Sequence, residues 1–183
     1  MILPEHEPHH KRLALYQYDR PMLMLGNQED KANLANNLFR EYTTFDPDGG
    51  DITEDIQSDL ERYYGRYNVV YNLGTLEHVW DAHRAYSNVA KMIKLGGIYA
   101  GHSPVGGYEN HGIHVTDYRQ ILSFFQLNGF DMIDHWLTDQ QGNHLSSVRR
   151  LQYNTILWCK FIKVKEIDTF VRPQQVFMNG API

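Results

Sequence analysis

Short apolar runs alternate along this chain with segments whose apolar residues recur at helical spacing, and this alternation limits the fold more than any other feature. Each apolar run has the length of one buried strand, and each periodic segment has the length of one helix. The expected strands cover residues 21–25, 42–45, 68–72 and 98–100, and the expected helices cover 29–39, 82–93 and 117–128. This order is typical of an α/β domain, in which helices cover a mostly parallel sheet.

The last third of the sequence departs from this order. Two strands are expected over residues 130–137 and 153–164, with a polar, mobile loop at 138–147 between them. Strands that are joined without a crossover helix pair in antiparallel fashion, so we place this pair at one edge of the sheet. The N-terminal stretch and the tail show no clear period. We therefore expect one domain over residues 1–183, with a core at about 20–165 and irregular ends.

Local signals mark the expected helix boundaries. Gly96 and Gly97 are expected to end the middle helix in a left-handed cap before the strand at 98–100. Thr116 is a residue type that caps helix N-termini, and Gly129 follows the end of the same helix.

Composition narrows the classes of partner and compartment. The formal net charge is −5 and the longest basic cluster is Arg149-Arg150, which argues against nucleic acid as a partner. No apolar run approaches the ~20 residues that span a bilayer, and the N-terminus lacks the features of a signal peptide. The single cysteine, Cys159, lies in an apolar run, so we interpret it as a core residue of a cytoplasmic protein.

Polar and small residues follow the first three expected strands, where open α/β sheets bind ligands. Gly26 would let a ligand approach the backbone closely after the first strand. Asp46 ends the second strand, where an acid can accept hydrogen bonds from both hydroxyls of a ribose. Asp55-Ile56 could meet an adenine edge, and Asn72-Leu73-Gly74 forms a small-residue turn after the third strand.

Each of these residues also has a purely structural interpretation. A glycine after a strand is often only a turn residue, and Asp46 lies in the turn-forming segment Asp-Pro-Asp-Gly-Gly. Asp55 could be a solvated or capping acid. It is the succession of glycine, acid and Asn-Leu-Gly behind three consecutive strands that favours a nucleoside-binding site.

The segments 67–79 and 93–98 resemble a known family. They are similar to the fourth-strand segment of class I S-adenosylmethionine-dependent methyltransferases and to the Leu-Lys-Pro-Gly-Gly turn that precedes that family's fifth strand. The resemblance covers about residues 20–165. It implies a Rossmann-like three-layer sandwich with a mostly parallel sheet of seven strands, or slightly fewer, that contains a late antiparallel strand. It also implies S-adenosylmethionine as the cofactor.

The resemblance assigns roles to eight residues at the strand ends. By it, Gly26 and Asn27 flank the methionine portion of the cofactor and Asp46 holds the ribose. The adenine is bordered by Asp55 and Ile56. The floor of the pocket is formed by Asn72, Leu73 and Gly74.

Departures from the family pattern keep a second interpretation open. Met24 stands at the place of the family's acidic residue, and Asn27-Gln28-Glu29 stands at the place of its spaced glycines. Leu95 replaces the usual proline. Too few residues lie between Asp46 and Asn68 for a full helix and strand, so that unit is shortened or absent.

Methyl transfer is an in-line displacement, so the protein must position the nucleophile and, where needed, accept its proton. Histidine suits the base role because its pKa lies near neutrality. His78 follows the third strand, and His111 lies in a glycine-flanked segment, 102–114, that is expected to be flexible. We predict these two as catalytic. Alternatively, Glu77 and His78 cap the following helix and His111 is a hydrogen-bonded loop residue.

No metal is predicted. Quinone O-methyltransferases share a similar Glu-His-Val, but the acid that they carry three residues before the glutamate is Gly74 here. His111 and His114 resemble a His-x-x-His pair, yet no cysteine or nearby acid in the sequence completes a zinc set. His6, His9 and His10 lie in an acidic stretch and are expected to be solvated.

The favoured function is thus an S-adenosylmethionine-dependent methyltransferase that acts on a small molecule, with a hydroxylated or saccharide acceptor. The alternative is a non-catalytic binding or interaction protein with the same fold. A dinucleotide or nucleotide-sugar enzyme is disfavoured, because the sequence has no glycine-rich pyrophosphate turn. The sequence leaves open whether the chain forms a homodimer.

Overall fold

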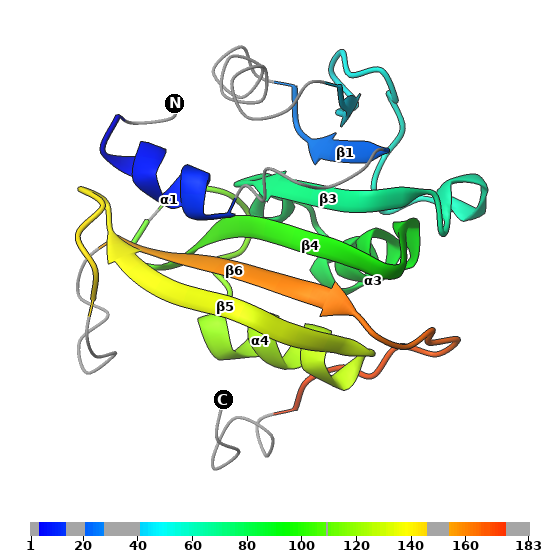
Figure 1. The fold of residues 1–183 in the computed structure, drawn as a ribbon. Coiled ribbons are helices and arrows are strands. Elements are labelled where there is room, and N and C mark those ends of the chain that lie inside the picture. Colours follow the sequence, from blue (N-terminus) through cyan, green and yellow to red (C-terminus); the bar gives the residue numbers. More distant parts are fainter. Residues whose placement is uncertain (1–3, 14–20, 28–40, 109, 146–153, 175–183) are drawn as a thin grey trace.

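A six-stranded sheet in the order β2-β1-β3-β4-β6-β5 runs through the molecule (Figure 1). The computed structural model describes residues 4–13, 21–27, 41–108, 110–145 and 154–174. The strands are β1 Met22–Leu25, β2 Thr43–Phe45, β3 Tyr67–Leu73, β4 Ile93–Gly106, β5 Phe130–Asp139 and β6 Thr155–Lys163. The α-helices in these ranges are α1 Glu7–Leu13, α3 Ala82–Met92 and α4 Tyr118–Leu127. None of the described helices has the length and apolar character that crossing a membrane requires.

The directions of the strands confirm the predicted fold class. β1 pairs in parallel with both β2 and β3, and β3 pairs in parallel with β4. β6 pairs antiparallel with β5, as the helix-free connection of the late strands predicts, and it also pairs antiparallel with β4. The sheet has six strands, because the segment between β2 and β3 forms only one turn of 3-10 helix, Glu61–Tyr63, between its loops.

Side chains that alternate along each strand build two cores, one on each face of the sheet. On β3, Val70 belongs to the core that packs against α3 and α4, whereas Val69 and Tyr71 belong to the core that includes Leu13 of α1. Figure 1 shows α1 on one side of the sheet and α3 and α4 on the other. The three-layer arrangement follows from this alternation, because successive residues of a strand point to opposite faces.

Two helix boundaries differ from the prediction: the end of α3, where a glycine cap was expected, and the start of α4, where a threonine cap was expected. Helix α3 ends at Met92 because Ile93 takes an extended conformation and pairs with Tyr67 of β3. Gly96, with φ of 79°, lies within β4, where the pairing with β3 shifts register between Ile93 and Ile98, and does not cap the helix. Helix α4 is capped by Asp117, whose side chain accepts a hydrogen bond from the Arg119 amide, rather than by Thr116.

Strand β4 is longer than predicted, and the expectation of a flexible segment is wrong for residues 102–106. His102 pairs with Trp158 and Pro104 with Ile156, so this stretch continues the sheet. Pro104 is tolerated there because β3 ends at Leu73, opposite His102, and leaves no strand on its other side. The loop predicted at 138–147 begins as part of β5 and, over its described residues, makes a hydrogen-bonded turn from Asp139 to Asn143.

The N-terminal segment is helical and buries its histidines, so the predictions of an irregular start and of solvated histidines are wrong. His6, His9 and His10 all lie against the ring of Trp158. The Nε2 atoms of His6 and His9 donate to backbone carbonyls of the turn after β5, at 2.8 Å each. These contacts are long-range in the sequence, which is why the local composition could not predict them.

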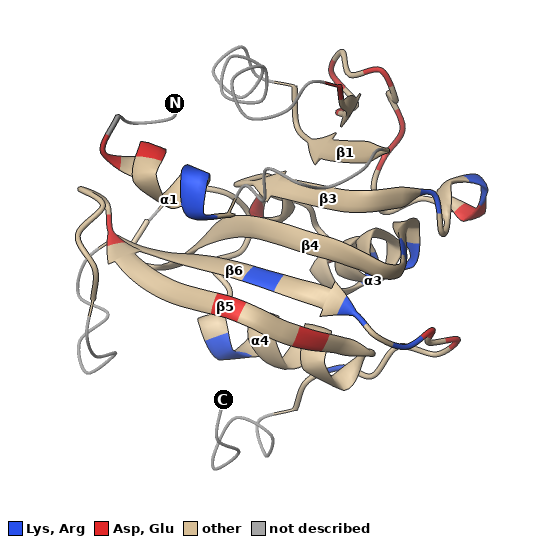
Figure 2. Cartoon of the chain, in the orientation of Figure 1, with Lys and Arg blue, Asp and Glu red and all other residues tan. Residues whose placement is uncertain are grey.

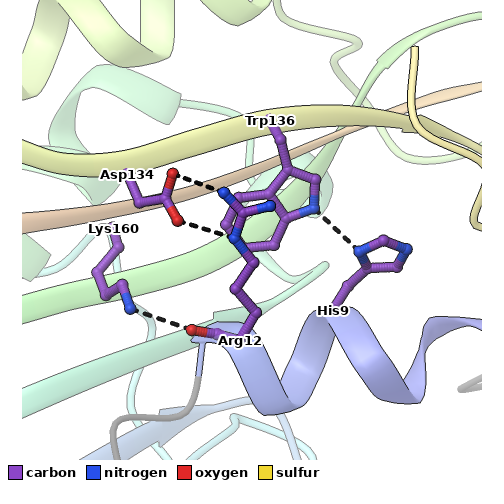
Figure 3. A network of polar contacts seen from close by, with 5 residues as sticks. All are labelled: His9, Arg12, Asp134, Trp136 and Lys160. Carbon is purple, nitrogen blue, oxygen red and sulfur yellow. Dashed lines mark hydrogen bonds and ion pairs between the residues drawn. The ribbon is translucent and has the colours of Figure 1, made fainter.

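Arg12 fastens the end of α1 to the sheet. Its guanidinium donates two hydrogen bonds to Asp134, at 2.9 and 3.0 Å, and lies 4.0 Å from the centre of the Trp136 ring (Figure 3). The ammonium of Lys160 donates to the Arg12 carbonyl at 3.1 Å, which satisfies an acceptor at the helix C-terminus. The helix is thereby tied to both β5 and β6.

Acidic residues gather on the segment that follows β2, whereas β1 carries none (Figure 2). Between residues 46 and 61 the chain contains several Asp and Glu but no Lys or Arg.

The helix predicted at 29–39 lies outside the described residues.

Candidate functional site

A cavity of about 440 Å³ lies at the carboxyl ends of β1, β2 and β3. The strand order reverses here, because the chain passes from β1 outward to β2 and then returns to β3 on the other side. Ligands of open α/β sheets bind at such reversal points. Six of the predicted site residues line the cavity, namely Gly26, Asp46, Asp55, Ile56, Gly74 and His78.

The carboxylate of Asp46 is held at the cavity by backbone amides. Its Oδ2 accepts a hydrogen bond from the Asn27 amide at 2.8 Å, and its Oδ1 accepts one from the Asp48 amide at 2.9 Å. An ionised carboxylate has about four acceptor sites, so each oxygen keeps capacity for a further donor. The arrangement presents a fixed, half-buried carboxylate that can accept hydrogen bonds from two neighbouring hydroxyls.

Asn27 and Gly26 join the ends of β1 and β2. The Gly26 amide donates to the Phe45 carbonyl at 2.9 Å, and the Asn27 side chain donates to the Gly49 carbonyl at 2.6 Å. Gly26 has φ of 88°, a conformation that favours glycine. Asn27 itself is exposed and does not line the cavity, so its observed part is to orient Asp46.

The opposite wall is the loop that carries Asp55 and Ile56. The Ile56 side chain is buried, while Asp55 is exposed and accepts hydrogen bonds from the amide and side chain of Gln57. Asn88 of α3 donates to the carbonyls of Ile56 and Ser58, at 2.7 and 2.9 Å. Helix α3 thus fixes an apolar side chain and a carboxylate at one end of the cavity.

Asn72 and Leu73 do not line the cavity. The Asn72 side chain is fully buried, where its amide donates to the Tyr99 hydroxyl and its Oδ1 accepts from the Thr75 amide at 3.1 Å. Leu73 belongs to the core on the α1 face. Of the three residues predicted to form the floor of the pocket, only Gly74, with φ of 66°, lines the cavity.

The structure brings both predicted catalytic histidines together around Glu77. The Glu77 side chain is buried, and its Oε1 lies 3.8 Å from Nε2 of His111. The rings of His78 and His111 are 5.0 Å apart between centroids. Glu77 and His78 do not cap α3, because Asp81 does so through a hydrogen bond from the Arg84 amide. His78 belongs to this cluster and also borders the cavity.

Backbone hydrogen bonds hold the segment after β4 against Glu77. The amides of Ile113 and His114 donate to the Glu77 carbonyl at 2.8 and 3.0 Å. Gly112, with φ of 73°, passes so close that an added Cβ would lie 2.9 Å from the same carbonyl oxygen. This glycine therefore allows the close approach that places His111 beside the carboxylate.

His114 is directed elsewhere. Its Nε2 lies 2.8 Å from the Trp80 carbonyl oxygen, at the border of a second cavity of about 450 Å³ between the starts of α3 and α4. The acid near His111 is Glu77, which sequence reasoning did not connect with it because 34 positions separate them. The signal that could have pointed to it was the Glu-His pair at the end of a buried strand.

No protein-family model matches the sequence, and no curated protein is significantly similar to it. Solved structures are similar, however. The N-methyltransferase NodS from Bradyrhizobium japonicum WM9, in complex with S-adenosyl-L-homocysteine, is 13% identical with a TM-score of 0.63, over 88% of this chain and 89% of NodS. An S-adenosylmethionine-dependent methyltransferase from Mesorhizobium loti is 10% identical with a TM-score of 0.60, over 86% of this chain and 97% of that one.

A third neighbour carries a different activity. The [4+2]-cyclase SpnF is 12% identical with a TM-score of 0.59, over 86% of this chain and 80% of SpnF. These likenesses establish that the chain has the class I methyltransferase fold, as the resemblance predicts. Since one fold hosts several reactions, function has to be argued from the site.

Proposed function

We propose that this chain, with its class I methyltransferase fold, is an S-adenosylmethionine-dependent methyltransferase that acts on a small molecule. The observation that carries the proposal is the cavity at the strand reversal, with Asp46 fixed at the end of β2. In this reading Asp46 accepts the ribose hydroxyls, Ile56 and Asp55 border the adenine, and Gly26 and Gly74 let the rest of the cofactor lie across the strand ends.

The charge around the cavity supports a cationic cofactor. Asp46, Asp48 and Asp55 line it, and no Lys or Arg does so among the residues that the structure describes. S-Adenosylmethionine carries a sulfonium and an ammonium, so a wall of carboxylates attracts it. The same wall disfavours a dinucleotide, whose pyrophosphate is anionic.

The acceptor is proposed to lie over the cluster of Glu77, His78 and His111. In the transfer, the acceptor atom forms a bond to the methyl carbon while the carbon–sulfur bond breaks and sulfur keeps the electron pair. A hydroxyl acceptor must also lose its proton, and this cluster is the polar group placed for that task. We therefore favour a hydroxylated acceptor, with a saccharide as one such class.

The first experiment is calorimetric titration with S-adenosylmethionine and S-adenosylhomocysteine. Asp46→Asn removes the charge and half of the acceptor capacity, so we expect about tenfold or greater loss of affinity. Asp131→Asn, on the exposed side of β5, is the control and should bind as wild type does. Absence of binding by the wild type at millimolar ligand, or equal affinity in the folded Asp46→Asn variant, would contradict the cofactor assignment.

The non-catalytic alternative has one observation in its favour, the reduced unit between β2 and β3. Against it, Met24 does not obstruct the cavity, because its side chain belongs to the core on the other face of the sheet. Cofactor binding without methyl transfer to any of a broad set of hydroxylated acceptors would favour a binding protein. Measured turnover of one acceptor would exclude it.

A further inference from the structure

Glu77, His78 and His111 form a group of potential metal ligands. One ligand atom from each, a carboxylate oxygen or an imidazole nitrogen, can be chosen so that all lie within 4.8 Å of one another. The carboxylate is buried and the two imidazoles are exposed, so the group has a rigid base and an open side. The prediction of no metal rested on Gly74 and on the view that no cysteine or nearby acid completes a zinc set with His111 and His114. The fold, however, brings Glu77 beside His111.

The backbone holds this group in place. The turn of Gly112 against the Glu77 carbonyl, together with the two amide hydrogen bonds to that oxygen, sets the distance between the segment of His111 and the end of β3. Gly74 leaves room on the other side, because an added Cβ would lie 3.0 Å from Oε1 of Glu77 and 3.3 Å from Nε2 of His102. A side chain at position 74 would therefore crowd Oε1 of Glu77.

We propose that Glu77, His78 and His111 bind one divalent transition-metal ion. Two imidazoles and one carboxylate are a donor set that suits zinc and its first-row neighbours, and three protein ligands leave a position for a further oxygen. Ligand atoms that surround one ion at about 2.1 Å lie roughly 3 to 3.5 Å apart. Small rotations of the exposed His78 and His111 rings would bring the group from its present spacing to that one.

The role of the ion rests on the proposed function. His78 also lines the cofactor cavity, so an acceptor oxygen in the open position would lie near the transferred methyl group. A bound divalent ion favours the alkoxide or phenolate over the hydroxyl, as it does for bound water. With the ion bound, the two imidazoles act as ligands rather than as the base, and the cluster promotes loss of the acceptor proton to solvent water through the ion. The substrate class is accordingly a hydroxyl compound with a second oxygen that can chelate the ion.

The test is titration of metal-free protein, without an affinity tag, with Co²⁺, followed by its visible absorption and by calorimetry. We expect one ion per chain and a spectrum typical of nitrogen and oxygen ligands. His111→Ala and Glu77→Gln should each lose about tenfold or more in affinity, because even outer-shell changes cost that much. His114→Ala is the matched control, since its ring is directed to Trp80, and it should bind as wild type does.

Two outcomes would overturn the proposal: no stoichiometric Co²⁺ binding, or equal affinity in wild type and the His111→Ala variant. Because His111 is exposed, that variant stays informative even if Glu77→Gln fails to fold. Titration of the same samples with S-adenosylhomocysteine separates the two claims. Metal binding lost with cofactor binding intact leaves the proposed function standing, whereas the reverse refutes the cofactor assignment and leaves the metal site.

Discussion

Single residues decide whether the site can assemble, and Gly112 is the clearest case. It has a left-handed conformation and also touches the Glu77 carbonyl, whereas Gly65 has φ of 62° and no atom within 4 Å of an added Cβ. The two glycines share the same backbone requirement, and of the two only Gly112 has an atom that an added Cβ would meet. Comparing them therefore separates backbone strain from contact with the site.

We expect Gly65→Ala to lower the free energy of unfolding by roughly 1 kcal/mol, the cost of a left-handed alanine. Gly112→Ala should cost more, about 2 kcal/mol, because the methyl group also meets a backbone oxygen. Urea unfolding monitored by circular dichroism measures both. Equal losses in the two variants would show that Gly112 makes no such contact.

At this scale the sequence predicted residue types better than residue contacts. Gly26, Asp46, Gly74 and His78 could be assigned to the cavity because strand ends of a parallel sheet meet at one edge. The burial of Asn72 could not be predicted, since its partners Tyr99 and Ser103 are on another strand. The pairing of Glu77 with His111 was missed for the same reason.

Among the elements, α1 differs most from the prediction, because histidines and not apolar residues make most of its contact with the sheet. The Nδ1 atom of the His9 ring accepts a hydrogen bond from Trp136 Nε1 (Figure 3). Its Nε2 atom donates to the Gly142 carbonyl. Both nitrogens are thus used in the neutral form. Burial lowers the pKa of His9, and burial together with the neighbouring His6 and His9 lowers the pKa of His10 to about 3.

Docking of α1 should therefore weaken in acid. The pKa of His10 is about 3 in the fold and about 6.5 when exposed, so the unfolded or undocked chain binds the proton between these values. Stability is complete above about pH 6.5 and falls by up to about 1.4 kcal/mol per pH unit below it, down to about pH 3.

His10→Phe removes this titration and should give a shallower loss of unfolding free energy between pH 6.5 and 4. Urea unfolding of both proteins at a series of pH values, followed by tryptophan fluorescence, is the measurement. Identical pH slopes in wild type and variant would mean that His10 is not buried in its neutral form.

Arg12 is the second attachment of α1. Arg12→Met keeps the aliphatic stem but loses the paired hydrogen bonds to Asp134 and the contact with Trp136, so we expect a loss of about 1 to 2 kcal/mol. Lys11→Met is the matched control. It breaks an exposed pair with Glu7 one turn away and should cost less than about 0.5 kcal/mol.

Urea unfolding and hydrogen exchange of the α1 amides follow both variants. An Arg12→Met protein as stable as Lys11→Met, with unchanged exchange in α1, would refute the role of this arginine.

For the whole molecule, the mostly parallel α/β sheet could be predicted because short apolar runs and helical periods alternate so regularly, and the late antiparallel pair because no helix joins its strands. The sheet has six strands and not seven because too few residues lie between Asp46 and Asn68 for a further helix and strand, as the sequence predicts. What could not be predicted is the wall that replaces the missing unit, an acidic loop anchored to α3 by Asn88. Its charge arises from residues that each look like ordinary turn formers.

That acidic wall predicts a salt effect on cofactor binding. S-Adenosylmethionine carries one more positive charge than S-adenosylhomocysteine, and salt screens its attraction to exposed and half-buried carboxylates over a Debye length of about 10 Å at 0.1 M. The dissociation constant of S-adenosylmethionine should therefore rise more steeply with salt concentration than the dissociation constant of S-adenosylhomocysteine. Calorimetric titrations at several salt concentrations test this. Parallel salt dependences would show that the carboxylates do not act on the sulfonium charge.

The central claim is that the cavity at the ends of β1, β2 and β3 binds the adenosyl cofactor. A crystal structure of the chain with S-adenosylhomocysteine tests it most directly. We predict both ribose hydroxyls within hydrogen-bonding distance of the Asp46 carboxylate, the adenine against Ile56, and the sulfur on the side of His78. A ligand bound elsewhere, or a cavity left empty at saturating ligand, would contradict the account.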